Sequence, residues 1–150
     1  MSCKKEKILN FQGNCIYFTN TSYSLSQSEK GYIKNLEYHS PNDKIFISEN
    51  SNIIDSNLCS NLSQMLDSYA NYYVKNILEI NHKLKKLNSW VTINKRGSSH
   101  QMHYHPNTFI SLCFYPQVKD SSINFYIPHS IIGSKTNFSF DIINPNIFNT

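Results

Sequence analysis

Glycine, arginine and long apolar runs are all scarce in this chain. It has four glycines and a single arginine, Arg96, among 150 residues, and no stretch reaches the roughly 18 apolar residues that a membrane-spanning helix needs. The N-terminal MSCKKEKILN is positively charged but lacks the apolar segment of a signal peptide. We therefore expect a soluble, cytoplasmic protein with no membrane partner.

The cysteines lack the spacings that build structural sites. Cys3, Cys15, Cys59 and Cys113 show no C-x-x-C pattern, which argues against a zinc ribbon, and their scatter argues against a disulfide framework. The formal charge of +4 comes from 14 basic against 10 acidic residues, and the lysines at 83–86 are typical of a solvated helix end. We expect reduced thiols and no nucleic-acid partner.

At 150 residues the chain has the length of one ordinary domain. Residues 1–44 form a poorly defined N-terminal segment, with one short strand candidate at 16–18 and a loop over 19–30. A second strand candidate at 44–47 opens the better patterned part of the chain. We therefore divide the sequence into this segment and a folded domain over 45–150.

A helix of about 22 to 26 residues is predicted within 58–84 from its apolar periodicity. The apolar residues recur every three or four positions, at Leu58, Leu62, Met65, Leu66, Tyr69, Tyr73, Ile77, Ile80 and Leu84. Ser56 or Asn57 is the expected N-cap. We expect the apolar face to lie on a sheet that begins at Trp90, and we interpret Tyr69, Tyr72 and Tyr73 as packing residues rather than as a ligand cage.

Only strands are predicted after this helix. Alternating or continuous apolar residues mark five segments, at 89–94, 101–105, 109–115, 122–127 and 137–143. Glycine, proline, asparagine, aspartate and serine fill the connections between them, as in turns. Short strands behind one helix predict an antiparallel sandwich or roll.

The segment Gln101–His105 carries the most specific pattern. In an extended chain successive side chains point to opposite faces, so His103 and His105 would share one face about 6 to 7 Å apart, and Pro106 would end the strand. Two imidazoles placed in this way can bind one metal ion. A hydrogen-bonded surface pair has the same spacing, so the spacing alone leaves both interpretations open.

The run from Ser89 to Tyr115, SWVTINKRGSSHQMHYHPNTFISLCFY, resembles the 2-oxoglutarate and Fe(II) dependent oxygenases that are common in marine phages and bacteria. The family has a Ser-Trp strand with an asparagine, a glycine turn, an H-x-H-P element and a serine-containing strand that ends in aromatic residues. These places are held here by Ser89, Trp90, Asn94, Gly97, His103, His105, Pro106, Ser111, Phe114 and Tyr115. The likeness covers 45–150 and is specific around Ser89–Tyr115.

The resemblance implies a mainly β, α+β domain built on a double-stranded β-helix, a cupin-like jelly roll, with the long helix packed on its sheet. It implies a dioxygenase, or hydroxylase, that uses Fe(II) and 2-oxoglutarate, with His103 and His105 as metal ligands. By analogy Asn94 contacts the co-substrate, although bonding to a turn backbone fits it equally well. The substrate, a small molecule or a protein side chain, stays open because pocket loops vary freely. A phage-encoded enzyme would act in the host cytoplasm.

The sequence departs from the family after the two histidines. The family's third ligand, a histidine followed by a basic residue, is not found, and the downstream His129 stands in a Pro-His-Ser turn that is typical of loop surface. The chain ends at Thr150, where the family continues into its last strands, so we expect an incomplete, C-terminally truncated roll that is inactive if nothing replaces the ligand. An open sheet edge would favour a homo-oligomer.

Two other functions fit the same residues. One is a non-catalytic β-roll that acts as a binding or virion-associated protein. The other is a cupin-like metal site that uses His100 together with His103 and His105. His100 precedes His103 by three residues, so in an extended chain it would point to the opposite face, which counts against this site.

Overall fold

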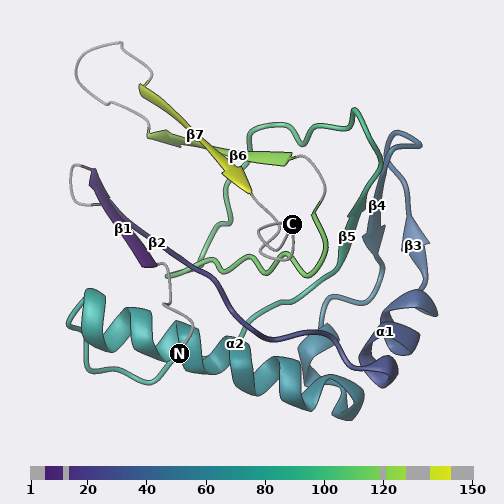
Figure 1. Ribbon diagram of the computed structural model, residues 1–150, viewed down its shortest axis with the longest axis horizontal. Coiled ribbons are helices and arrows are strands. Elements are labelled where there is room, and N and C mark those ends of the chain that lie inside the picture. The colour runs from purple at the N-terminus through teal and green to yellow at the C-terminus, as the bar shows by residue number, and fades with distance from the viewer. Residues whose placement is uncertain (1–5, 12–13, 119–120, 128–135, 143–150) are drawn as a thin grey trace, which may run out of the picture. The chain divides into compact units, whose positions relative to one another are not determined.

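The computed structural model describes residues 6–11, 14–118, 121–127 and 136–142 (Figure 1). The chain forms two compact units, the first made of Met1–Gln101 and His105–Leu112 and the second of Met102–Tyr104 and Cys113–Thr150. Among the described residues no helix combines the length and the apolarity needed to cross a membrane. The fold is mixed α+β with small, separate antiparallel sheets.

Two of these sheets lie in the first unit. The hairpin of β1 (Glu6–Phe11) and β2 (Asn14–Thr19) forms the first, which confirms the strand predicted around 16–18. The second has the order β3-β4-β5, from β3 (Tyr38–His39), β4 (Ile45–Ser48) and β5 (Thr92–Asn94). The strand candidate at 44–47 is thus confirmed as the central strand of a three-stranded sheet.

A short helix, α1 (Gln27–Lys34), begins inside the stretch that we predicted to be a loop. The Ser26 hydroxyl accepts a hydrogen bond from the Glu29 N–H at 3.2 Å, and the Glu29 carboxylate accepts one from the Ser26 N–H at 2.7 Å. This reciprocal pair is a capping box, which satisfies two backbone donors at the start of a helix. The loop prediction was therefore wrong over 27–30.

The long helix is confirmed in its first part. A 3₁₀ turn (Asn57–Cys59), α2 (Ser60–Tyr72) and a π-helical turn (Tyr73–Ile77) form one continuous helical segment of 21 residues. Ser56, one of the two predicted caps, accepts a hydrogen bond from the Leu58 N–H at 3.3 Å. The helix thus begins where the sequence places it.

The predicted helix was too long at its C-terminal end. Glu79 has a φ of +55°, in the left-handed region, and the Ile80 N–H reaches back to the Val74 carbonyl at 2.9 Å. A left-handed residue followed by a backward hydrogen bond ends a helix, usually with glycine in that place. Glutamate occupies this position here, so the sequence has no glycine that would mark the end of the helix. The apolar pattern continues to Ile80 and Leu84, and the predicted helix was therefore too long.

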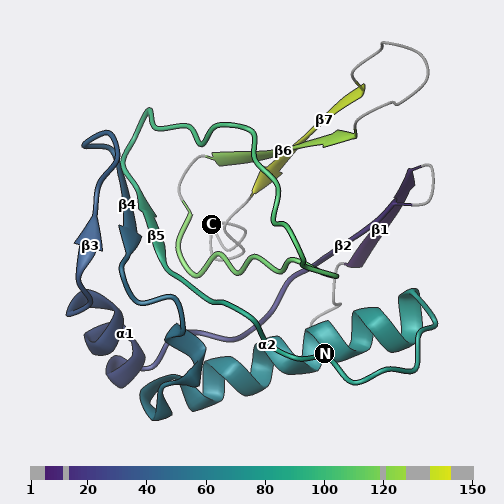
Figure 2. The ribbon, with the colours of Figure 1, turned by 180° about the vertical axis from the view of Figure 1, so that it is seen from behind.

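The core of the first unit gathers around the start and the end of the helical segment. Among the residues whose burial is described, the buried apolar ones are Ile45, Ile53, Cys59, Leu62 and Val74. Figures 1 and 2 show α1 beside the start of the segment, and the Tyr73 hydroxyl donates to the Cys15 carbonyl of β2 at 2.5 Å. The helix therefore packs on N-terminal elements, whereas we had expected a sheet beginning at Trp90 to cover it.

The predicted double-stranded β-helix is wrong. Within the described residues β5 pairs with β4, and β6 (Ser121–Ile127) pairs with β7 (Thr136–Ile142), and no sheet is closed or of jelly-roll form. The strands predicted at 122–127 and 137–143 are confirmed, with their bounds shifted by one residue. They form a separate antiparallel hairpin in the second unit.

The strands predicted at 101–105 and 109–115 are also wrong, because the chain is irregular there. Alternation predicts a strand only when one face is buried, and the apolar side chains of this pattern are exposed: Met102 by 69%, Tyr104 by 83% and Phe109 by 66%. Without these two strands, β5 and β6 have no intervening strands to join them into a roll. The jelly roll predicted over 45–150 therefore lacks its central strands.

Candidate functional site

The segment predicted to carry the site begins at a firmly held residue, Ser89. Its N–H donates to the Ser51 carbonyl at 2.8 Å, and its carbonyl accepts from the Ile53 N–H at 3.1 Å. Its hydroxyl also accepts from the Ile54 N–H at 3.1 Å. Two residues later, the Val91 N–H donates to the buried Ser48 hydroxyl at 3.1 Å. These bonds hold the first residues of the segment beside the three-stranded sheet.

Asn94 ends β5, and its side chain faces His100. Asn94 Oδ1 lies 2.9 Å from His100 Nε2. A turn after Lys95 brings the two together, because the Ser98 N–H and hydroxyl both donate to the Lys95 carbonyl, at 3.1 and 2.7 Å. Gly97 has a φ of +75° in this turn, which glycine adopts without strain. Asn94 is therefore engaged with an imidazole, and its predicted contact with a co-substrate stays a prediction.

The two histidines of the H-x-H pattern have different surroundings. His105 is half-buried and lies against Trp90, with ring centroids 5.4 Å apart and planes inclined by 45°. His103 is exposed and belongs to the second unit. Residues 101–105 form no strand, and the shared face was derived from a strand. Metal binding by this pair stays a prediction that now rests on spacing and not on a strand.

The ligands available among the described residues can be compared with those that the expected metal site needs. Imidazole nitrogen is a ligand that Fe(II), Zn(II) and Cu(II) accept, so the donor chemistry of the two histidines fits a divalent metal. No group of three or more His, Cys, Asp or Glu side chains within the described ranges could hold one ion. A complete three-ligand set of the oxygenase type is thus not present among them, and His129 lies outside them.

A buried carboxylate and a buried thiol lie together between α1 and the long helical segment. The Glu29 side chain, 1% exposed, accepts hydrogen bonds from the Tyr23 hydroxyl at 2.5 Å and from the Leu62 N–H at 3.1 Å, besides the Ser26 N–H. Burial raises the pKa of Glu29, but these bonds outweigh burial and the net pKa lies below the usual range. Burial and the Glu29 charge raise the pKa of Cys59. The thiol is therefore protonated at neutral pH, and the pair is structural and not a nucleophile with its base.

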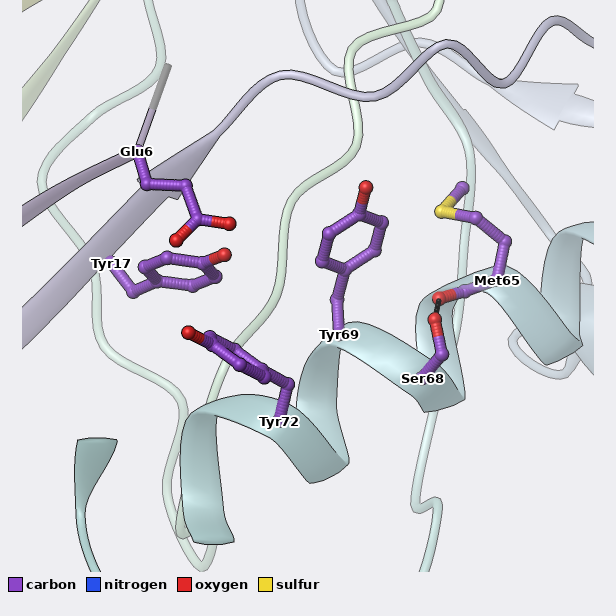
Figure 3. Close-up of a pocket in the computed structure, with 6 residues that line it drawn as sticks. All are labelled: Glu6, Tyr17, Met65, Ser68, Tyr69 and Tyr72. Carbon is purple, nitrogen blue, oxygen red and sulfur yellow. Dashed lines mark hydrogen bonds between the residues drawn. The ribbon is translucent and has the colours of Figure 1, made fainter. Parts of the chain in front are cut away.

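A pocket of about 290 Å³ lies between the N-terminal hairpin and the helix (Figure 3). Its lining is aromatic and acidic: Glu6, Tyr17, Met65, Ser68, Tyr69 and Tyr72. The rings of Tyr17 and Tyr72 are tilted by 41° at a centroid distance of 5.7 Å. Figure 3 shows Tyr17 between the Glu6 carboxylate and Tyr72, with its hydroxyl pointing toward Tyr69.

Two of the six lining residues, Glu6 and Tyr17, could not be linked to this pocket from the sequence. We interpreted Tyr69 and Tyr72 as packing residues, and the structure places both on the wall of the pocket. Glu6 and Tyr17 stand on the hairpin, and no periodicity in the sequence links the hairpin to the helix. The Tyr73 to Cys15 hydrogen bond makes that link, and the stacking of Tyr73 on Tyr17 at 6.3 Å reinforces it.

Comparison with known proteins adds no relative: no family model, no curated protein and no solved structure matches this chain.

Proposed function

We propose that the segment Ser89–Tyr115 binds a divalent metal through His103 and His105, as the protein half of an Fe(II) and 2-oxoglutarate dependent oxygenase site. The observation that carries the proposal is the spacing of two accessible imidazoles around one residue, followed by proline, in the H-x-H-P pattern. Two residues span at most about 7 Å of backbone. This separation along the chain is short enough for two imidazoles to bind one ion, each through a metal–nitrogen bond of roughly 2.1 Å.

The neighbours of the pair support this function. Trp90 packs on His105 and restricts its ring, which lowers the entropy that binding must remove. The hydrogen bond between His100 Nε2 and Asn94 Oδ1 holds His100 at the end of β5, only three residues before His103. In the family that the sequence resembles, bound Fe(II) activates dioxygen while 2-oxoglutarate is decarboxylated. The role assigned to this chain is narrower, since its two imidazoles hold and orient the ion.

Anaerobic Fe(II) titration of protein made without a histidine tag tests the metal site. We expect one equivalent to bind, and His103→Ala and His105→Ala each to weaken the affinity by about tenfold or more, since each removes a ligand. His82→Ala is the matched control, because His82 is exposed and lies outside the segment. Equal affinity of all four proteins would show that the pair does not bind the metal.

A second measurement separates metal binding from oxygenase chemistry. Succinate release from 2-oxoglutarate in the presence of Fe(II) and dioxygen shows whether the bound ion reacts, and any release should be lost in the His103→Ala, His105→Ala double variant. Stoichiometric metal binding without succinate would overturn the oxygenase function while leaving the metal site. In that case a non-catalytic metal-binding module becomes the function to pursue.

A further inference from the structure

The pocket between the hairpin and the helix combines a carboxylate with three tyrosine rings. Glu6 is exposed, and among the described residues it takes part in no ion pair. Tyr17, Tyr69 and Tyr72 line the same space (Figure 3). Aromatic faces carry negative electrostatic potential and attract cations that lie within about 6 Å of the ring centroid. The charge and the ring potentials in this pocket therefore have the same sign.

The pocket also contains a buried, neutral hydroxyl close to its carboxylate. The Tyr17 hydroxyl is buried and makes no hydrogen bond of good geometry within the described residues, although Glu6 and Thr19 lie close enough to affect its pKa. Burial raises the pKa of Tyr17, so its hydroxyl stays protonated and neutral at physiological pH. A neutral hydroxyl places no positive charge beside a bound cation, and a quaternary ammonium, which has neither donor nor acceptor, leaves the hydrogen bonding of this hydroxyl unchanged.

The size of the pocket limits the ligand to a small group. Its volume of about 290 Å³ lies just below the roughly 300 to 1,000 Å³ that is usual for ligand sites. A trimethylammonium head group fits such a space, and its methyl groups suit the apolar flanks of Met65 and the tyrosine rings. A metal ion suits it less well, because Glu6 is the only carboxylate among the described lining residues and tyrosine rings are poor ligands for hard cations.

We propose that this pocket binds a methylated organic ammonium ion, with Tyr17, Tyr69 and Tyr72 forming the cage and Glu6 supplying the counter-charge. The ammonium group would lie against the rings, with the carboxylate at its side. This site is independent of the metal proposed for Ser89–Tyr115, and none of its lining residues belongs to that segment. The same head group occurs in free small molecules such as choline and in trimethylated lysine side chains.

Calorimetric titration of the full chain with choline, against the neutral carbon isostere in which a tert-butyl group replaces trimethylammonium, tests the chemistry of the site. For so small a ligand we expect a Kd of about 0.1 to 1 mM for choline. The isostere should bind at least tenfold more weakly, since it has the same shape and no charge. A trimethyllysine peptide forms the third arm. If it binds more tightly than choline, the source of the head group is a protein, and equal or weaker binding indicates a free metabolite.

Variants locate the binding within the pocket. Tyr69→Leu keeps an apolar helix residue but removes a ring, and it should weaken choline binding about tenfold. Glu6→Gln should weaken it severalfold and flatten its dependence on salt. Tyr104→Leu and Glu37→Gln are the matched controls, because both residues are exposed and lie outside the pocket.

Two results would overturn the proposal. Equal binding of choline and its isostere would mean that the pocket accepts apolar groups without regard to charge. No choline binding to a chain whose circular dichroism shows an intact fold would mean that the rings only pack. Because no metal is added in these titrations, their failure is distinct from failure of the Fe(II) site.

Discussion

The helix at 57–77 and the segment at 95–112 both carry a clear apolar pattern, yet the two differ in what supports the pattern. The helix has a cap at Ser56, a buried acceptor in Glu29 and a tie to β2 through Tyr73. The segment has a glycine turn and ring contacts, and its apolar side chains are largely exposed. Periodicity therefore predicted the correct element where the apolar residues of the pattern are packed, and a wrong one where they are exposed.

The largest expected effect is on the buried acceptor of the helix. Glu29→Ala leaves the Tyr23 hydroxyl and the N–H groups of Ser26 and Leu62 without their acceptor, so we expect a loss of about 3 to 4 kcal/mol in the free energy of unfolding, measured with urea. Glu49→Ala, an exposed control, should stay within about 0.5 kcal/mol. A Glu29→Ala loss below about 1 kcal/mol would contradict the importance of this carboxylate.

Substitution of Glu29 should also change how the free energy of unfolding decreases at acidic pH. The pKa of folded Glu29 is lowered, so its contribution is complete above the unfolded carboxyl pKa of about 4.3 and is lost as pH falls through the lower folded value. Glu29→Gln has no such group, and its stability should fall less over that acidic window. If the free energy of unfolding fell equally with pH in the unaltered chain and in Glu29→Gln, the hydrogen bonds would not favour the ionised form of Glu29.

A smaller effect is expected where the hairpin meets the helix. Tyr73→Phe removes the donor to the Cys15 carbonyl and should lower the free energy of unfolding by about 1 kcal/mol, with Tyr72→Phe as the half-exposed control.

Burial and the contacts with Cys15 raise the pKa of Tyr73 to about 12. The Tyr73 contribution is thus complete below the usual pKa near 10 and is lost as pH rises toward 12. Identical urea midpoints for Tyr73→Phe and Tyr72→Phe would argue against this tie.

The smallest effect is expected in the irregular segment. In the absence of metal, His103→Ala should change the free energy of unfolding by no more than about 0.5 kcal/mol, because the side chain is exposed and its backbone lies in no helix or strand. Urea titration in the presence of a chelator measures this value. A loss near that of Tyr73→Phe would show that the segment is held as firmly as the helix, and the contrast between the two regions would then disappear.

The elements that sequence reasoning predicted correctly are those set by local rules. The start of the helix follows from Ser56 and the apolar period, and the strands at 16–18, 44–47, 122–127 and 137–143 follow from short apolar or alternating runs. The Ser26 to Glu29 spacing is also a local capping signal, and it marked the start of α1 within the stretch predicted to be a loop.

The parts that escaped prediction depend on contacts between distant residues. Glu79 ends the helix with a backbone conformation that glutamate rarely adopts, so residue type gave no warning. The pocket needs Glu6 and Tyr17 from the hairpin to meet Tyr69 and Tyr72 from the helix, and this meeting depends on a tie between Cys15 and Tyr73 that spans 58 positions. The metal site was inferred from a strand that the structure lacks at 101–105, and only its histidine spacing is left to test.

The hydrogen bond from the Leu62 N–H to Glu29 spans 33 positions of the chain. A shortened protein that started at residue 45 would keep every residue of the long helix and lose the acceptor that closes its first turn. Such a fragment is expected to fray from residue 60 inward and to expose Cys59 to alkylating reagents. The stretch before residue 45, which carries little pattern of its own, thus completes a helix that is encoded after it.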